Sequence, residues 1–240
     1  MAKDLTLKTI RSTPDRRMSE IITAARALLA EKGSENFVTT EVASRCGVSE
    51  GTIFRYFPTK RDLLLKVTEA WFAEILAEEP QRAPHPGTFD RLRQVIWRSL
   101  SIVRREPALT RYVLMELRSD PTYRSMPIYE LNRRFTSSVT ALVQEAVAAG
   151  EFRDDVSAKL VRDMIFGCIE HRTWAYLRGE GDFSVDATAD AIAQIIFRGM
   201  TIRPQHDDDS LASSIAVLER TIESLQREIC LLKDRRSTNT

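Results

Sequence analysis

Four residues in the first quarter of the chain have types and spacings suited to one kind of chemistry, contact with a nucleic-acid duplex. At 100° per residue, Gly51 and Arg55 lie on the same side of a helix, with Thr52 beside them. An arginine can pair with guanine or phosphate, a threonine offers a hydroxyl and a methyl group to thymine, and a glycine lets the backbone approach the bases. Lys60 stands at the start of the next predicted helix, where its side chain can reach a phosphate of the same duplex. The pattern predicts a helix that enters the major groove of DNA.

Two short helices joined by a tight turn are expected to hold this surface. The first of them should end at Gly47, which can adopt the positive φ that such a turn requires. Ser49 then caps the second, and Pro58 limits it to about two turns. Ile53 and Phe57 point away from the proposed DNA face and suit a core. This arrangement is typical of a helix-turn-helix.

Apolar residues recur at helical spacing along nearly the whole chain, so an all-α protein is predicted. The first helix should begin after Thr13, a capping residue followed by proline, and end at Gly33. Thr59, with Asp62 three residues on, should start the fourth helix. A loop is predicted over 80–87, PQRAPHPG, because it contains three prolines and a glycine. Beyond this loop, helices are predicted near 88–105, 108–118, 123–149, 157–178 and 185–200.

The charges of the chain are nearly balanced, with 35 Lys and Arg against 34 Asp and Glu, so any nucleic-acid surface must be local. Positive charge is concentrated at the start, where residues 1–66 hold 12 Lys and Arg against 8 Asp and Glu. Residues 1–13 form a basic arm, which is either part of a nucleic-acid surface or an ordinary solvated leader.

The same composition argues against several other classes of protein. Cys46, Cys168 and Cys230 lie far apart and outside any CxxC pair, so neither a disulfide framework nor a zinc site is indicated. No signal-peptide stretch and no run of about 18 apolar residues occurs, so a cytoplasmic protein without membrane contact is expected. Glycine-rich phosphate loops, nucleophile elbows and metal-ligand spacings are also missing. We therefore predict no enzyme, no catalytic residue, no metal and no cofactor.

The stretch from Ile21 to Leu64 carries a more specific signal. Its segments AARALLAEKG and TTEVASRCGVSEGTIFRYFPTKRDLL resemble the DNA-binding domain of the TetR family of bacterial regulators. The resemblance implies a three-helix DNA-binding domain over 14–66 and a ligand-binding and dimerisation domain over 67–203. It also implies contacts to operator DNA at these positions: Thr39, Thr40, Ser49, Glu50, Gly51, Thr52, Phe54, Arg55, Tyr56 and Lys60.

Three positions depart from the family pattern. Phe54 replaces the usual tyrosine, which removes a phenolic hydroxyl that would bond a phosphate. Val38 replaces the usual capping threonine, so either Thr39 caps the second helix or the start of this helix shifts by one residue. Glu50 stands where lysine is common, and its carboxylate either reads cytosine N4 or repels phosphate at other sequences.

Family members act as twofold dimers, and the resemblance places the interface on helices 157–178 and 185–200. Two recognition helices would then lie about 34 to 36 Å apart, so a palindromic operator is expected. The apolar faces would come from these residues: Leu160, Met164, Ile165, Ile169, Ile192, Ile195, Ile196 and Phe197.

Residues of an effector site are harder to assign from sequence than the DNA-contacting residues, because aromatic residues at helical spacing more often belong to a hydrophobic core than to a pocket. Candidate lining residues are Trp97, Tyr112, Met115, Met126, Tyr129, Phe135, Phe166, Glu170, His171 and Trp174. Residues 166–174, FGCIEHRTW, resemble the corresponding helix of regulators that sense fatty acyl-CoA, while Glu170 and His171 could equally belong to an interface. We expect the protein to be a repressor that a small apolar effector releases from DNA. The alternative is a structural DNA-binding protein that responds to no ligand.

Residues 204–240 hold an acidic linker and a heptad repeat that the family core does not require. Isoleucine occupies every a position and leucine every d position, which favours a parallel two-stranded coiled coil. A helix that folds back on its own domain and a contact between dimers that builds a tetramer are the alternatives. The repeat consists of Leu211, Ile215, Leu218, Ile222, Leu225, Ile229 and Leu232.

Overall fold

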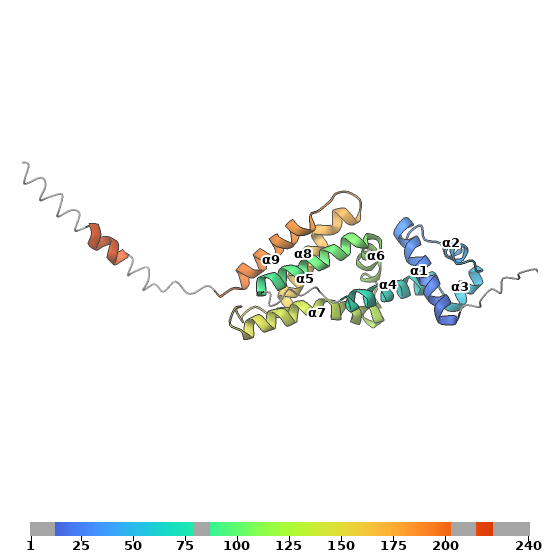
Figure 1. Cartoon of the computed structure of the whole chain (residues 1–240), viewed down its shortest axis with the longest axis horizontal. Helices are drawn as coiled ribbons and strands as arrows, with labels where there is room; N and C mark the ends of the chain where they lie inside the picture. Colours follow the sequence, from blue (N-terminus) through green and yellow to red (C-terminus); the bar gives the residue numbers. More distant parts are fainter. Residues whose placement is uncertain (1–12, 79–86, 203–214, 223–240) are drawn as a thin grey trace, which may run out of the picture. The chain divides into compact units, whose positions relative to one another are not determined.

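The structure is a computed structural model that describes residues 13–78, 87–202 and 215–222 (Figure 1). Helices account for nearly all regular structure in these ranges, which contain no β-strand, so the predicted all-α class is confirmed. By its internal contacts the chain divides into two units, residues 1–200 and 201–240.

Four helices make the N-terminal part: α1 (Pro14–Lys32), α2 (Thr39–Arg45), α3 (Glu50–Tyr56) and α4 (Lys60–Ala77). The predicted local signals set their ends. The side chain of Thr13 caps α1, Gly47 takes a φ of 62° in the turn after α2, and the Ser49 side chain accepts the Thr52 N–H at the start of α3. Thr59 and Asp62 form the predicted capping box of α4.

The start of α2 differs from both alternatives drawn from the sequence. Val38 is the N-cap residue and makes no side-chain hydrogen bond, while Thr39 is already the first helical residue. Thr39 therefore does not cap the helix, and the start of the helix is not shifted from Val38. The Thr39 hydroxyl instead takes part in a tertiary contact, in which it donates to Glu50 Oε1 at 2.6 Å.

Helices α5 (Thr88–Arg105), α8 (Ala158–Leu177) and α9 (Val185–Met200) agree closely with the predicted ranges, whereas α7 (Pro127–Ala148) begins later than the predicted start at 123. The segment between α5 and α7 is more broken than predicted. It begins as α6 (Pro107–Arg111), continues as a π-helix, η1 (Tyr112–Leu117), and ends in the short 3₁₀ turn η2 (Tyr123–Ser125). The extended backbone of Met126 before Pro127 separates this turn from α7.

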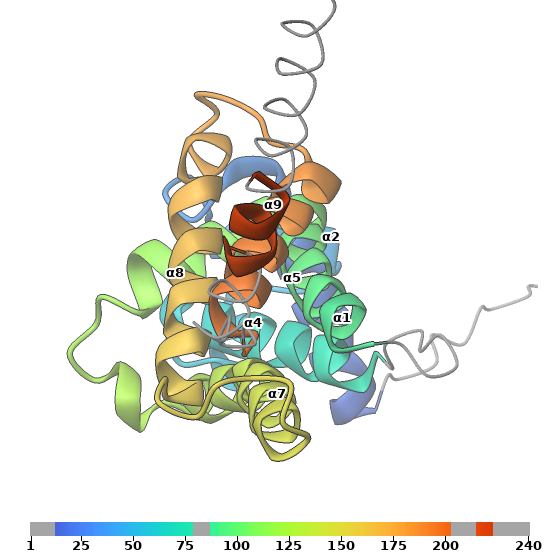
Figure 2. The same cartoon turned by 90° about the vertical axis from the view of Figure 1, so that its left-hand side faces the viewer.

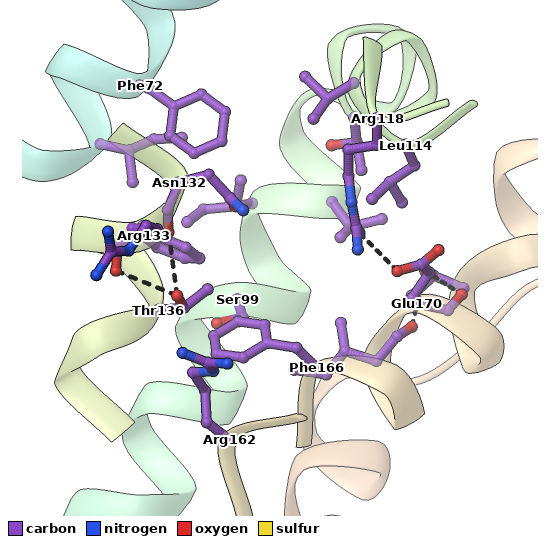
Figure 3. A pocket seen from close by; sticks show the side chains of 18 of the residues that line it. Phe72, Ser99, Leu114, Arg118, Asn132, Arg133, Thr136, Arg162, Phe166 and Glu170 are labelled. Atoms are coloured by element: carbon purple, nitrogen blue, oxygen red, sulfur yellow. Dashed lines mark hydrogen bonds and ion pairs between the residues drawn. The ribbon is translucent and has the colours of Figure 1, made fainter. Parts of the chain in front are cut away.

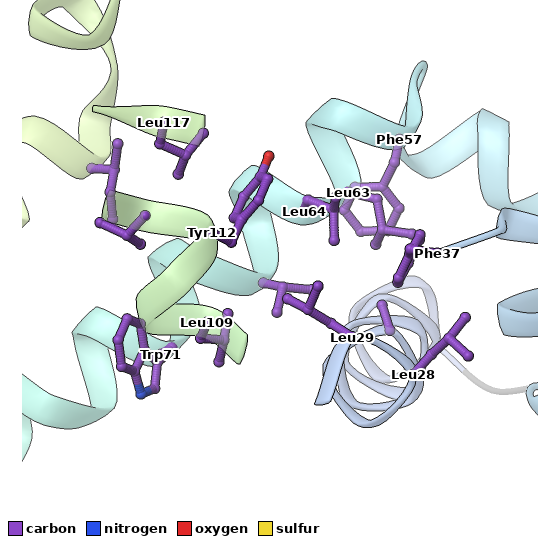
Figure 4. Packing of buried hydrophobic residues seen from close by; sticks show 14 of the residues in the cluster. Leu28, Leu29, Phe37, Phe57, Leu63, Leu64, Trp71, Leu109, Tyr112 and Leu117 are labelled. Carbon is purple, nitrogen blue, oxygen red and sulfur yellow. The ribbon is translucent and has the colours of Figure 1, made fainter. Parts of the chain in front are cut away.

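Two hydrophobic clusters organise the first unit. One joins α1–α4 to the α6–η1 segment, so that Leu29 and Leu64 share a core with Leu109, Tyr112 and Leu117 (Figure 4). The other lies among α5, α7, α8 and α9. The first cluster continues into α6 and η1. A displacement of this segment would therefore change the packing of the helices that carry the proposed DNA face.

Residues 215–222 of the second unit are helical. The heptad positions in this stretch, Ile215, Leu218 and Ile222, are exposed to solvent. The remaining heptad positions, Leu211, Leu225, Ile229 and Leu232, lie outside the described residues. The coiled coil therefore stays a prediction.

Candidate functional site

Helix α3 presents two different faces, as the spacing predicted. Ile53 is fully buried and Phe57 is 4% exposed, so both belong to the core. Gly51 and Arg55 are exposed on the other side, and Thr52 beside them is half-buried. Phe54 is 41% exposed, which is unusual for a large apolar side chain and leaves its ring free for an outside contact. The polar face of α3 is therefore available to a partner.

Local contacts restrict the side chains on this face. The Ser49 and Thr52 hydroxyl oxygens lie 3.0 Å apart, so the two hydroxyls form a hydrogen bond. The Arg55 guanidinium carbon lies 5.8 Å from the centre of the Tyr56 ring, a distance that suits a cation–π contact. These contacts hold Thr52 and Arg55 at the surface of the same short helix.

Lys60 contacts the segment between α1 and α2. Its ammonium group donates to the Ser34 carbonyl at 2.8 Å and lies 5.6 Å from the centre of the Phe37 ring. A phosphate contact by Lys60 remains a prediction, and it would have to share the ammonium group with Ser34.

Glu50 and Thr39 join α3 to α2. Thr39 is 9% exposed and Glu50 is half-buried, so their hydrogen bond is partly shielded from water. Thr40 is exposed at the start of α2. Because one Glu50 oxygen accepts from Thr39, the carboxylate is held at the start of α3, beside the proposed DNA face.

Replacing Glu50 with glutamine tests the role of this charge. Glutamine keeps an acceptor for Thr39 and removes the negative charge, so we expect affinity for any duplex to rise about threefold to tenfold. Fluorescence anisotropy with an operator and with a scrambled duplex would measure the change. A loss of affinity confined to the operator would instead identify Glu50 as a reader of cytosine.

A cavity of about 680 Å³ lies among α4–α8 and η1 (Figure 3). Aromatic rings form much of its wall, since Phe72 and Phe135 have ring centres 6.3 Å apart and Phe135 and Phe166 6.0 Å. Trp71, Ile75, Ile102 and Val113 add further apolar surface. The cavity is suited to an apolar body.

Charged side chains gather at the same cavity. Arg118, Arg133, Lys159 and Arg162 line it together with two carboxylates, Asp163 and Glu170. Arg162 pairs with Asp163 at 2.6 Å, and Arg118 pairs with Glu170 at 2.7 Å. Four cations against two carboxylates make the lining net positive, so the cavity combines an apolar chamber with a cationic part.

Only part of the predicted effector set meets at this cavity. Tyr129, Phe135, Phe166 and Glu170 line it. The other six candidates, Trp97, Tyr112, Met115, Met126, His171 and Trp174, are not among its lining residues. The sequence reasoning missed Trp71 and Phe72, whose helical spacing resembles that of ordinary core residues, and the four cations, which resemble any solvated face.

The six candidates outside the lining have other surroundings. Trp97 is 40% exposed and donates to Asp186 at 3.0 Å. Tyr112 belongs to the first hydrophobic cluster, where burial raises its pKa to about 12. Met126 packs against that cluster, and Met115 is half-buried in η1. His171 and Trp174 are exposed on α8.

Two absences concern the described residues alone. No helix in those ranges is both long and apolar enough to cross a membrane. The same residues contain no group of three or more His, Cys, Asp or Glu placed to hold a metal ion.

Comparison with known protein families agrees with these features. Residues 21–67 match the model of bacterial regulatory proteins of the tetR family, and residues 86–200 match a tetracyclin repressor-like C-terminal domain. The fold and site define a helix-turn-helix transcriptional regulator. The chain belongs to the TetR family.

Two relatives illustrate the roles described for similar proteins. The fatty acid metabolism regulator protein of Bacillus subtilis is 22% identical over 182 residues, which cover 75% of this chain and 94% of that protein. The nucleoid occlusion factor SlmA of Pectobacterium carotovorum is 34% identical over 108 residues, which cover 42% of this chain and 52% of that protein. The second similarity thus spans about half of the SlmA protein.

Solved structures show the same fold. The Bacillus subtilis regulator FadR in complex with stearoyl-CoA has a TM-score of 0.61 and 23% identity, covering 75% of this chain and 98% of that chain. A Saccharomonospora viridis regulator in complex with choline has a TM-score of 0.65 and 23% identity, covering 79% of this chain and 100% of that chain. The fold therefore accommodates chemically different ligands in different proteins.

Proposed function

We propose that this chain is a ligand-responsive repressor, released from a palindromic operator when an effector with an apolar body occupies the cavity. The observation that carries the proposal is the pairing of an exposed polar face on α3 with a cavity whose wall includes part of the segment packed against α1 and α4. An effector that prefers one arrangement of this segment lowers operator affinity by its differential affinity for the two arrangements.

Dimerisation through α8 and α9 is part of this proposal. The two helices run beside each other in Figure 2, and large apolar side chains on them are exposed, including Leu160, Met164, Trp174 and Ile195. Of the residues assigned to this face from the sequence, Ile165, Ile169 and Ile196 are instead buried within the protomer. The exposed set supports a four-helix interface with a second copy, because apolar side chains grouped on one surface favour burial.

A fatty acyl-CoA is our candidate effector. An aromatic and aliphatic chamber suits an acyl chain, and the net positive lining suits the phosphates of coenzyme A. The similarity to a fatty acid regulator and to a regulator bound to stearoyl-CoA supports the same chemistry.

Selection of bound DNA followed by a gel shift tests the proposal. The full-length protein would first be used to select its sequence from random duplexes, and decanoyl-CoA would then be titrated into the complex with the selected site. We expect release of DNA at micromolar decanoyl-CoA, while coenzyme A alone has no effect. Persistent binding with every acyl-CoA tested, from decanoyl to stearoyl, would contradict this effector class.

A DNA-binding protein that senses nothing is the second candidate, favoured by the similarity of 42% of the chain to nucleoid occlusion factors. This candidate predicts that no small molecule alters the gel shift and that the cavity stays empty in solution. Native mass spectrometry of the purified protein separates the two candidates, since a co-purifying ligand in the cavity favours the sensor.

Deletion of residues 205–240 tests the proposed coiled coil. Residues 1–200 form a compact unit without this tail, so the shortened chain should still fold. If the tail pairs in parallel within a dimer, its loss should raise the dimer dissociation constant about tenfold or more. Sedimentation over a concentration series would measure this. Loss of a tetramer would show contact between dimers, and a lower melting temperature at unchanged mass would show a folded-back helix.

A further inference from the structure

The Arg118–Glu170 ion pair lies where a ligand would meet it. Arg118 follows η1 and Glu170 belongs to α8, and both side chains line the cavity. In Figure 3 the two side chains point toward each other from different elements, and Arg118 Nη1 donates to Glu170 Oε2 at 2.7 Å. The pair thus links two walls of the cavity.

This ion pair is one that a competing anion can replace. The two side chains are 41% and 30% exposed, and pairs with this much solvent contact contribute little free energy. A single Arg118 nitrogen makes the hydrogen bond to Glu170, whereas a guanidinium can bind a carboxylate or phosphate through two parallel bonds. An incoming anion that offers better geometry, together with an apolar body in the chamber, would displace Glu170.

The surroundings favour an anion and disfavour a cation. Lys159 and Arg133 line the same cavity. Arg133 lies 3.7 Å from Glu130 of its own helix, whereas Lys159 makes no ion pair within the described part of the chain. Arg162 is balanced by Asp163. When Glu170 leaves Arg118, the positive potential at the Arg118 guanidinium increases, which an anionic ligand would neutralise.

Arg118 is also close in sequence to the contacts that hold the DNA-binding helices. Two residues before it, Glu116 accepts a hydrogen bond from Ser34 in the turn after α1. Two residues after it, Asp120 pairs with Arg61 of α4. Hydrogen bonds from Thr122 and then from Arg61 lower the Asp120 pKa to about 2, so this carboxylate is charged at neutral pH. Arg118 therefore lies between two residues that contact the turn after α1 and helix α4.

We propose that Arg118 binds the anionic group of the effector in exchange for Glu170, so that the effector is an anionic amphiphile whose charge is read at the segment that contacts the DNA-binding helices. This inference rests on the proposed effector role of the cavity. A fatty acid carboxylate, an alkyl phosphate and the phosphates of an acyl-CoA all share the required chemistry.

Calorimetric titration of the full-length protein with chain-matched probes tests this assignment. The probes are decanoate, decyl phosphate, decanoyl-CoA and the neutral 1-decanol. We expect at least one anion to bind about tenfold more tightly than 1-decanol, and the preferred anion identifies the source of the charge. Equal affinity for all four probes would overturn the role of Arg118 while leaving the cavity as a binding site. If no probe binds, the proposed effector site itself fails.

Three variants make the test specific. Arg118→Gln should weaken binding of the preferred anion about tenfold, leave 1-decanol unchanged and reduce release of DNA by that anion. Glu170→Gln should lower the dissociation constant of the anion about threefold, because the competing carboxylate is removed. This variant also tests the proposal if Arg118→Gln does not fold. Arg91→Gln is the matched control, since Arg91 makes an exposed ion pair with Glu145 and does not line the cavity. Unchanged anion affinity in Arg118→Gln and Glu170→Gln would overturn the inference.

Discussion

Replacing Arg55 with alanine is expected to weaken operator binding by about 1 to 3 kcal/mol, because an exposed guanidinium on α3 can bond a guanine edge through two hydrogen bonds. Anisotropy titrations of the selected operator would measure the loss. A base contact predicts relaxed preference at one position of each half-site, whereas a phosphate contact predicts a uniform loss and a salt dependence reduced by about one charge.

The control for Arg55 is Arg153→Ala. Arg153 is also an exposed arginine, and it pairs with Asp155 between α7 and α8. Its loss removes the same charge from the molecule without changing α3, so operator affinity should be unaltered. An equal loss in both variants would mean that net charge alone explains the Arg55 effect.

Replacing Ile53 with alanine is expected to lower the free energy of unfolding by about 2 to 5 kcal/mol. Ile53 is fully buried on the inner face of α3, and the cluster that it joins extends through α4 to η1. A cavity at this position would loosen α3 and also weaken DNA binding. Urea unfolding followed by circular dichroism would measure the change.

Val38→Ala is the comparison for Ile53, because Val38 is a β-branched residue of the same helix-turn-helix that is 44% exposed. It should cost less than about 1 kcal/mol, since little apolar surface is lost from the core. Similar losses in the two variants would contradict the assignment of Ile53 to the inner face and, with it, the outward orientation of Arg55.

Local signals made the DNA-binding part predictable from sequence. Gly47, Ser49 and Pro58 fix the turn and both ends of α3 through backbone preferences that act over a few residues. Once these ends are known, helical periodicity alone separates Ile53 from Arg55. The start of α2 was mispredicted because the partner of Thr39 lies 11 residues away, in another helix.

The cavity was much less predictable, because its walls come from residues far apart in sequence. Phe72 and Phe166 belong to different helices, and neither their type nor their spacing separates a cavity wall from packed core. Arg118 and Glu170 are 52 positions apart. The π-helical geometry of η1 also has no simple sequence signal, since Tyr112–Leu117 fits an ordinary helical pattern.

Selection of random duplexes by the full-length protein, repeated at low and moderate ionic strength, is the decisive test of DNA recognition by α3. We expect enrichment of one palindrome with half-sites about one helical turn apart, affinity that falls steeply with salt, and loss of the sequence preference in Arg55→Ala. If the protein enriches no sequence and does not bind duplex DNA even at low ionic strength, α3 is not a DNA-recognition helix.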